Sequence, residues 1–140
     1  MENYQIIKGG VFADTRGKIF HVNTFDMSEV KRFYTVENTI SKPLRAWQGH
    51  QKESKWFYVV NGTFLIGLVE PNDWSNPDRN LPIYKIILTA EESKILFIPP
   101  GYANGIKALT ENAKMMVFSN FTIDQGAEDN IKFDLNTWQL

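Results

Sequence analysis

Residues 44–62 read LRAWQGHQKESKWFYVVNG and contain one of the two histidines of the chain, one arginine and two lysines. Residues 44–50 favour a β-strand, whose side chains alternate between two faces. Gln48 and His50 then share one face, and Trp47 lies on the other. We expect the polar face to line a cavity.

The second half of this stretch predicts another strand and a tight turn. Residues 55–60 are mostly apolar and open with Lys55, which alternation places on an inward face. Asn-Gly at 61–62, followed by a further apolar run, is a strong signal for a two-residue hairpin turn. Lys55 and His50 should therefore converge near the rim of a β-lined cavity, with Arg45 at its mouth.

Strand signals dominate the rest of the chain. Turn composition marks residues 14–17 and 99–101, and helix is suggested only at 27–32 and in the tail. Roughly ten short strands separated by turns indicate an all-β sandwich or barrel. We expect one domain over residues 1–140. The predicted strands outside the opening stretch are 5–11, 18–23, 32–37, 63–69, 83–88, 94–98, 106–109 and 114–121.

Composition excludes several classes of function. A net charge of -1 offers no electrostatic footprint for nucleic acid or an anionic membrane. The apolar runs are too short to span a bilayer, and the first residues do not resemble a signal peptide. The absence of cysteine rules out disulfides and thiol catalysis and fits a cytoplasmic location. The acidic residues between 124 and 134 are expected on a solvated surface.

The opening stretch resembles the first motif of the cupin superfamily, whose fold is a jelly-roll barrel, or double-stranded β-helix. That motif is His-x-His, a spacer, Glu, six residues and Gly. Counting back from Gly62 places Lys55 at the Glu position, His50 at the second His position and Gln48 at the first.

Residues 98–105, IPPGYANG, resemble the second cupin motif, Pro-x-Gly-x-x-His, with Asn104 at the histidine position. Three of the four metal-ligand positions therefore hold glutamine, lysine and asparagine. One imidazole beside a lysine ammonium is a poor site for zinc or iron. We expect no metal and no cofactor, which also disfavours a metal-dependent dioxygenase.

Within the cupins, the chain resembles the sugar-nucleotide branch, which contains dTDP-4-dehydrorhamnose 3,5-epimerases and dTDP-4-keto-6-deoxyhexose 3,4-ketoisomerases. The matching segments lie in the same order in the chain, and they are residues 12–18, 31–34, 44–50, 98–105 and 118–121. The resemblance implies a homodimer that binds a nucleotide-linked sugar. It also implies proton abstraction beside a ketone, through an enediolate, in the synthesis of surface-polysaccharide precursors.

The resemblance also implies roles for individual residues. Gln48 stands where the family has its base, and Phe118 lies near the position of the epimerase tyrosine, so His50 is the remaining candidate base. Lys55 would stabilise the enolate. The implied substrate-binding residues are Arg45, Gln48, Arg16, Tyr34 and Asn104, with Tyr102 as an alternative phenol to Tyr34.

Alternative interpretations stand beside these roles. His50 can equally be a structural histidine, Arg16 can be a turn residue, and Asn104 fits turn chemistry better than ligand binding. Trp47 is expected to pack or to form an interface. The whole chain can also be a carbohydrate-binding or sugar-nucleotide-binding cupin without catalytic activity.

Overall fold

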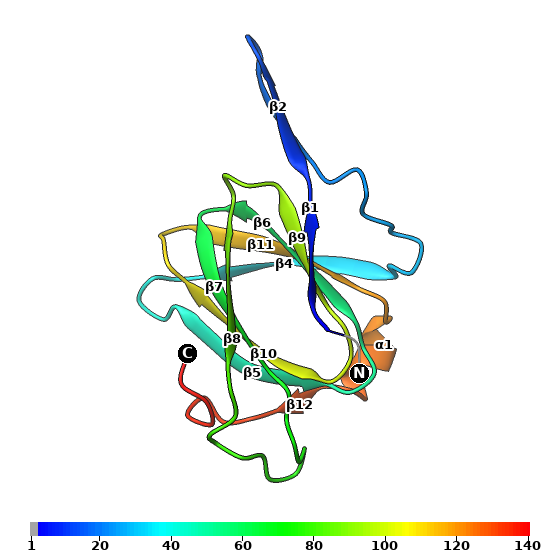
Figure 1. The fold of residues 1–140 in the computed structure, drawn as a ribbon, viewed down its shortest axis with the longest axis vertical. Coiled ribbons are helices and arrows are strands. Elements are labelled where there is room, and N and C mark those ends of the chain that lie inside the picture. Colours follow the sequence, from blue (N-terminus) through cyan, green and yellow to red (C-terminus); the bar gives the residue numbers. More distant parts are fainter. Residues whose placement is uncertain (1–2) are drawn as a thin grey trace.

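The computed structural model describes residues 3–140, which form two five-stranded antiparallel sheets and a projecting hairpin (Figure 1). The first sheet has the order β1 (Gln5–Lys8), β9 (Lys94–Ile98), β6 (Lys55–Asn61), β11 (Ala113–Ser119) and β4 (Arg32–Asn38). The second has the order β12 (Ile131–Lys132), β5 (Leu44–His50), β10 (Tyr102–Ala108), β7 (Thr63–Val69) and β8 (Tyr84–Thr89). The predicted all-β architecture is confirmed.

Two further elements lie outside these sheets. The hairpin consists of β2 (Gly10–Asp14) and β3 (Gly17–His21) and extends away from the body of the molecule (Figure 1). The short helix α1 (Ile123–Ala127) begins with a capping box, in which Thr122 and Gln125 satisfy each other's backbone N–H groups. No helix within residues 3–140 is long and apolar enough to cross a membrane.

The core lies between the two sheets, where alternate strand residues meet. Strands β6 and β7 are joined by the predicted Asn-Gly turn, in which Gly62 has a φ of 71°. This left-handed conformation costs glycine little. The inward residues that form the core include Phe57, Val59, Phe64, Ile66, Leu68, Leu96, Met115 and Val117.

The helix predicted at residues 27–32 is wrong. Val30 closes a single turn by donating its backbone N–H to Met27, and the chain enters β4 at Arg32. Strand β4 pairs with β11 over its whole length. Residues 27–32 are too few to form a stable helix by themselves, because isolated helices of this length are unstable. The pairing of β4 with β11 then stabilises the extended chain from Arg32 onward.

The C-terminal tail packs on the outer face of the second sheet. The Trp47 and Trp138 rings meet edge to face with centroids 5.3 Å apart, and Trp47 Nε1 donates to the carbonyl of Trp138 at 3.0 Å. Gly49 allows the ring of Trp74 to approach the strand, because a Cβ at this position would overlap that ring. Trp47 is therefore a packing residue, and its burial turns Gln48 toward the opposite face.

Replacing Trp138 should destabilise the fold, because its side chain is 2% exposed and anchors the tail. We expect Trp138→Ala to lower the free energy of unfolding by about 3–5 kcal/mol in urea denaturation, since it removes a buried aromatic ring. Trp138→Phe should lose less. A loss below about 1 kcal/mol for Trp138→Ala, the usual size of a surface effect, would show that the tail does not anchor β5.

Candidate active site

The two sheets part between β4 and the β12–β5 edge, and a cleft opens there. One cavity of about 610 Å³ is lined by the inner residues of β4, β5 and β10 and by the tail. A second cavity of about 310 Å³ lies beside α1. Tyr34, Gln48 and Lys55 line both cavities, so the two adjoin. Most of the polar residues singled out from the sequence face this cleft.

Arg45 reaches the cleft through an irregularity in strand pairing. Asn104 pairs with Gln48, but Ile106 pairs with Arg45, so the register shifts by one residue between them. Simple alternation would place Arg45 and Gln48 on opposite faces. The shift puts both on the cavity side, since Asn104 and Ile106 share a face.

Arg45 is held at the rim by two hydrogen bonds to the first sheet. Its Nε donates to Asn38 Oδ1 at 2.6 Å, and its Nη2 donates to the carbonyl of Glu37 at 3.0 Å. The guanidinium therefore bridges the two sheets at the mouth of the larger cavity. Arg45 is otherwise exposed, which leaves donors available for a ligand.

Lys55 points inward, as its position in the strand predicts. It is 6% exposed, and its Nζ donates to the hydroxyl of Tyr34 at 3.0 Å. The nearest carboxylate oxygen, on Glu53, lies 4.0 Å away. A buried ammonium with one neutral hydrogen-bond partner attracts negative charge to the cleft.

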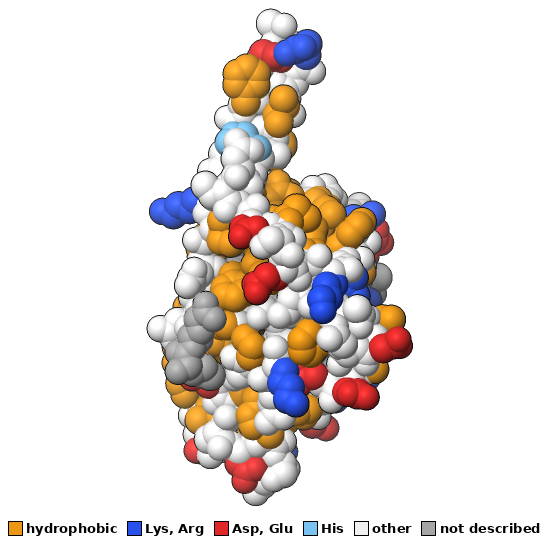
Figure 2. Space-filling model, turned by 90° about the vertical axis from the view of Figure 1, so that its right-hand side faces the viewer, with side chains coloured by type: hydrophobic (Ala, Val, Ile, Leu, Met, Phe, Trp, Pro, Cys, Tyr) orange, Lys and Arg blue, Asp and Glu red, His pale blue; other side chains and the backbone are white. Residues whose placement is uncertain are grey.

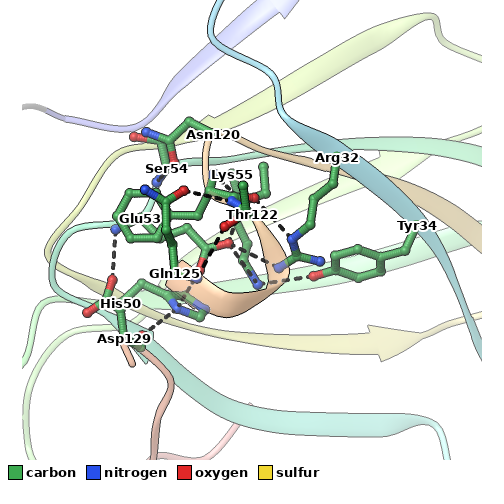
Figure 3. Close-up of polar contacts among 12 residues, drawn as sticks. Arg32, Tyr34, His50, Glu53, Ser54, Lys55, Asn120, Thr122, Gln125 and Asp129 are labelled. Carbon is green, nitrogen blue, oxygen red and sulfur yellow. Dashed lines mark hydrogen bonds and ion pairs between the residues drawn. The ribbon is translucent and has the colours of Figure 1, made fainter. Parts of the chain in front are cut away.

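Glu53 is the central residue of the smaller cavity and was not identified from the sequence. Its carboxylate accepts from the hydroxyl of Ser119 at 2.5 Å and lies 3.5 Å from Arg32 Nη2. Its other oxygen lies 3.4 Å from His50 Nδ1. Figure 3 shows Arg32 and His50 beside Glu53. Glu53 belongs to the polar residues 51–54 between two predicted strands. Such a segment is typical of a solvent-exposed loop, so no sequence signal indicated that Glu53 is buried.

His50 has a defined tautomer. Its Nδ1 lies 2.9 Å from the carbonyl of Asp129, and a carbonyl can only accept, so Nδ1 carries the proton. Nε2 therefore holds the lone pair, and it has no hydrogen-bond partner among residues 3–140. Burial, and then the positive charge of Lys55, lowers the pKa of His50, although Glu53 and Asp129 oppose this shift. A neutral imidazole with a free lone pair can act as a base near neutral pH.

Asp129 corrects the prediction of a solvated acidic tail. It is 6% exposed, and its carboxylate accepts the backbone N–H groups of Gln51, Lys52 and Glu53 at 2.8–2.9 Å. The tail thereby fixes the loop that carries Glu53. A single aspartate satisfies three buried donors, and this pairing is not visible from composition.

The cluster is a poor metal site, although His50, Glu53 and Asp129 place ligand atoms within 4.8 Å of one another. Both oxygens of Asp129 already accept backbone N–H groups. Arg32 and Lys55 face the carboxylate of Glu53. Two cations beside the donor set repel a divalent ion, so these residues do not fit a metal.

The remaining candidates lie in different places. Asn104 is buried within β10 and lines the larger cavity. The interpretation of Asn104 as a turn residue is therefore wrong. Tyr102 packs in the core, and Phe118 packs on Phe25 outside the barrel. Arg16 pairs with Asp14 at the tip of the hairpin, outside both cavities, with its side chain 84% exposed.

Comparison with known proteins gives the family. The sequence matches the dTDP-4-dehydrorhamnose 3,5-epimerase family over residues 1–139. The chain belongs to this family. Membership confirms the predicted class of enzyme, the isomerases and epimerases of dTDP-linked sugars. Curated protein sequences give no match to the chain.

Solved structures share the fold of this family member at low sequence identity. A mutant 3,4-ketoisomerase from Thermoanaerobacterium thermosaccharolyticum, in complex with TDP-4-keto-6-deoxyglucose, is 22% identical, with a TM-score of 0.71 over 95% of this chain and 89% of that chain. The TDP-quinovose 3,4-ketoisomerase of Campylobacter jejuni is 23% identical, with a TM-score of 0.70 over 95% of each chain. The rmlC epimerase of Mycobacterium tuberculosis is 16% identical, with a TM-score of 0.74 over 93% of this chain and 68% of that chain.

The lowered pKa of His50 predicts a loss of stability in mild acid. An unfolded histidine, with a pKa near ~6.5, binds a proton before the folded one does. Stability should therefore fall as the pH drops through about 6.5 and level off below the folded pKa. We expect His50→Gln to flatten this dependence in urea denaturation between about pH 7.5 and 5.5, where ordinary carboxylates stay ionised. An unchanged slope in the variant would contradict the assignment.

Proposed function

We propose that this protein rearranges a dTDP-linked 4-keto-6-deoxy sugar through an enediolate, with His50 as the base. The observation that carries the proposal is the unpartnered, buried Nε2 of His50, a residue that lines the same cavity as the Lys55 ammonium. A base and a cation in one cavity are what proton abstraction beside a ketone requires. The proposal needs no metal or cofactor.

The chemistry follows from these two groups. His50 Nε2 takes a proton from the carbon next to the ketone, and the C–H electron pair moves toward the carbonyl to form the enediolate. Lys55 stabilises the oxyanion that develops. The hydroxyl of Tyr34, which accepts a hydrogen bond from Lys55, is placed to exchange a proton at the same site. Protonation of the same carbon on its opposite face completes an epimerisation, and protonation of the neighbouring carbon completes a ketoisomerisation.

The larger cavity supports binding of the nucleotide part of the substrate. Its volume of about 610 Å³ lies in the range of ligand sites. Arg45 and Lys132 line it and can pair with a diphosphate, while Gln48 and Asn104 offer amides to sugar hydroxyls. The Thermoanaerobacterium structure holds TDP-4-keto-6-deoxyglucose in the same fold, which supports a substrate of this class.

Deuterium exchange tests the proposed reaction. Incubation with dTDP-4-keto-6-deoxyglucose in deuterated water should place deuterium at ring carbons, and NMR should identify which carbons exchange. We expect His50→Ala and Lys55→Met to slow exchange by about 100-fold or more. The exposed Lys85→Met serves as a matched control for Lys55→Met and should exchange like the wild type.

The outcome separates the two classes of function left open by the sequence. Binding of the nucleotide sugar without exchange by the wild-type protein would overturn the enzymatic proposal for this substrate and favour a binding protein. Exchange at different carbons distinguishes a 3,5-epimerase from a 3,4-ketoisomerase. Cytoplasmic location and a role in surface-polysaccharide precursor synthesis belong to the same proposal.

We also propose that two copies of the chain form a homodimer through the projecting hairpin. Hydrophobic side chains are exposed on the hairpin and on the adjoining body of the molecule, among polar atoms (Figure 2). Phe12 and Ile19 on the hairpin are 55% and 60% exposed, and Phe33 on β4 is 63% exposed. Large apolar side chains exposed on a projecting element support an interface between proteins. Arg16, at the tip of this hairpin, would approach a substrate only through the partner.

Mutation of the hairpin tests the dimer. We expect light scattering at micromolar concentration to give twice the mass of 16.2 kDa for the wild type. Phe12→Asp combined with Ile19→Asp should give the monomer mass, because charge in an apolar interface is costly to desolvate. The exposed Ile87→Asp, on β8, should leave the dimer intact. A monomeric wild type would contradict the proposal.

A further inference from the structure

Glu53 occupies a position that the cupin motifs do not explain. It lies between His50 and Lys55 in the sequence, and its side chain is 1% exposed. Four partners surround its carboxylate: His50, Lys55, Arg32 and Ser119. Two of these four are the proposed base and the proposed oxyanion stabiliser. A buried carboxylate 3.4 Å from His50 Nδ1 and 4.0 Å from Lys55 Nζ is placed to influence both charges.

We propose that Glu53 is a positioning residue that faces the Nδ1 edge of His50 and stabilises the imidazolium formed during turnover. Its Oε1 lies 3.4 Å from His50 Nδ1, on the ring edge opposite the free lone pair. The Asp129 carbonyl, at 2.9 Å, accepts the Nδ1–H, so Nε2 is the nitrogen able to take a proton. Glu53 Oε1 faces the same edge of the ring at ion-pair distance.

The surroundings of Glu53 fix its carboxylate in this orientation. Ser119 donates to Oε2 at 2.5 Å, and Arg32 Nη2 lies 3.5 Å from the same oxygen, so Oε1 is turned toward His50. Helix α1 packs against the pair at Gly126. A Cβ there would come within 3.3 Å of Arg32 Nη2 and 3.4 Å of Glu53 Oε1. The absence of a side chain at position 126 lets the helix cover the ion pair closely.

The charge balance around His50 explains why a carboxylate is needed. Lys55 disfavours the imidazolium, as does burial, whereas the carboxylates of Glu53 and Asp129 favour it. Asp129 is committed to three backbone N–H groups. Glu53 is therefore the carboxylate that faces the ring. After His50 takes the substrate proton, the new positive charge lies beside Glu53, which offsets the repulsion from Lys55.

The assignment of Glu53 to turnover rests on the proposed function, but its pairing with His50 can be measured separately. The probe is the imidazole itself, followed by ¹⁵N NMR across a pH titration of the folded protein without substrate. The chain contains two histidines, so a His21→Gln background leaves only His50. We expect an Nδ1–H tautomer for neutral His50 and a titration midpoint below ~6.5.

Glu53→Gln should lower the His50 midpoint further, by about one pH unit, because the facing negative charge is lost. Glu53→Asp keeps the charge but withdraws it from the ring, so its midpoint should fall between those of Glu53→Gln and the wild type. Glu92→Gln is the matched control: its carboxylate is exposed and pairs with Lys94. This control should leave the midpoint unchanged.

Kinetics supply the second measurement, with the deuterium exchange assay. We expect Glu53→Gln to reduce kcat by about tenfold or more with KM changed less than about twofold, since it acts on the base and not on binding. The acidic limb of the kcat/KM profile should move to lower pH with the NMR midpoint. Glu53→Asp should recover part of kcat.

Each outcome decides one of the two proposals. A His50 midpoint that does not move in Glu53→Gln or Glu53→Asp overturns the positioning role, whatever the activity. If Glu53→Gln does not fold, Glu53→Asp alone gives the comparison. A lowered midpoint supports the pairing even where the wild type exchanges no proton of the sugar, and that second result would overturn only the proposed reaction.

Discussion

The carboxylate of Glu53 holds the functional end of the barrel together. It connects Arg32 on β4, Lys55 on β6, Ser119 on β11 and His50 on β5, so it links both sheets. A buried carboxylate needs such partners, because an uncompensated charge is costly to bury. The same requirement brings two cations and an imidazole into one small cavity. The gathering of these charged groups at one end of the cleft follows from this constraint.

The outer packing of the second sheet determines what faces the cleft. Trp47 is buried against Trp138 in the tail, and Gly49 accommodates Trp74. With these residues fixed outward, Gln48 and His50 must point inward. The tail contributes again through Asp129, which binds the loop before Lys55. The segment that covers the barrel from outside thus also positions the residues inside it.

The family is retained here with an altered set of functional groups. The relatives share the fold at 16–23% identity, and glutamine stands at the position that the resemblance assigns to the base. An amide cannot abstract a proton, but His50 lies two residues further along the same face of the strand. In the proposed reaction, His50, with its unpartnered Nε2 and neighbouring carboxylate, takes the role of the base at that shifted position.

The sequence by itself determined most of the strands, the Asn-Gly turn, the outward Trp47 and the inward Lys55, although the strand predicted at 5–11 divides into β1 and β2 and β10 begins at Tyr102. These features are set by local alternation and turn chemistry, which act over a few residues. Only the tertiary structure decided the roles of Glu53 and Asp129, whose partners lie 66 and 76–78 residues away along the chain. It also brought Arg45 to the cleft through a register shift that no alternation pattern reveals. Buried charges are compensated by neighbours in space, and a sequence lists neighbours only along the chain.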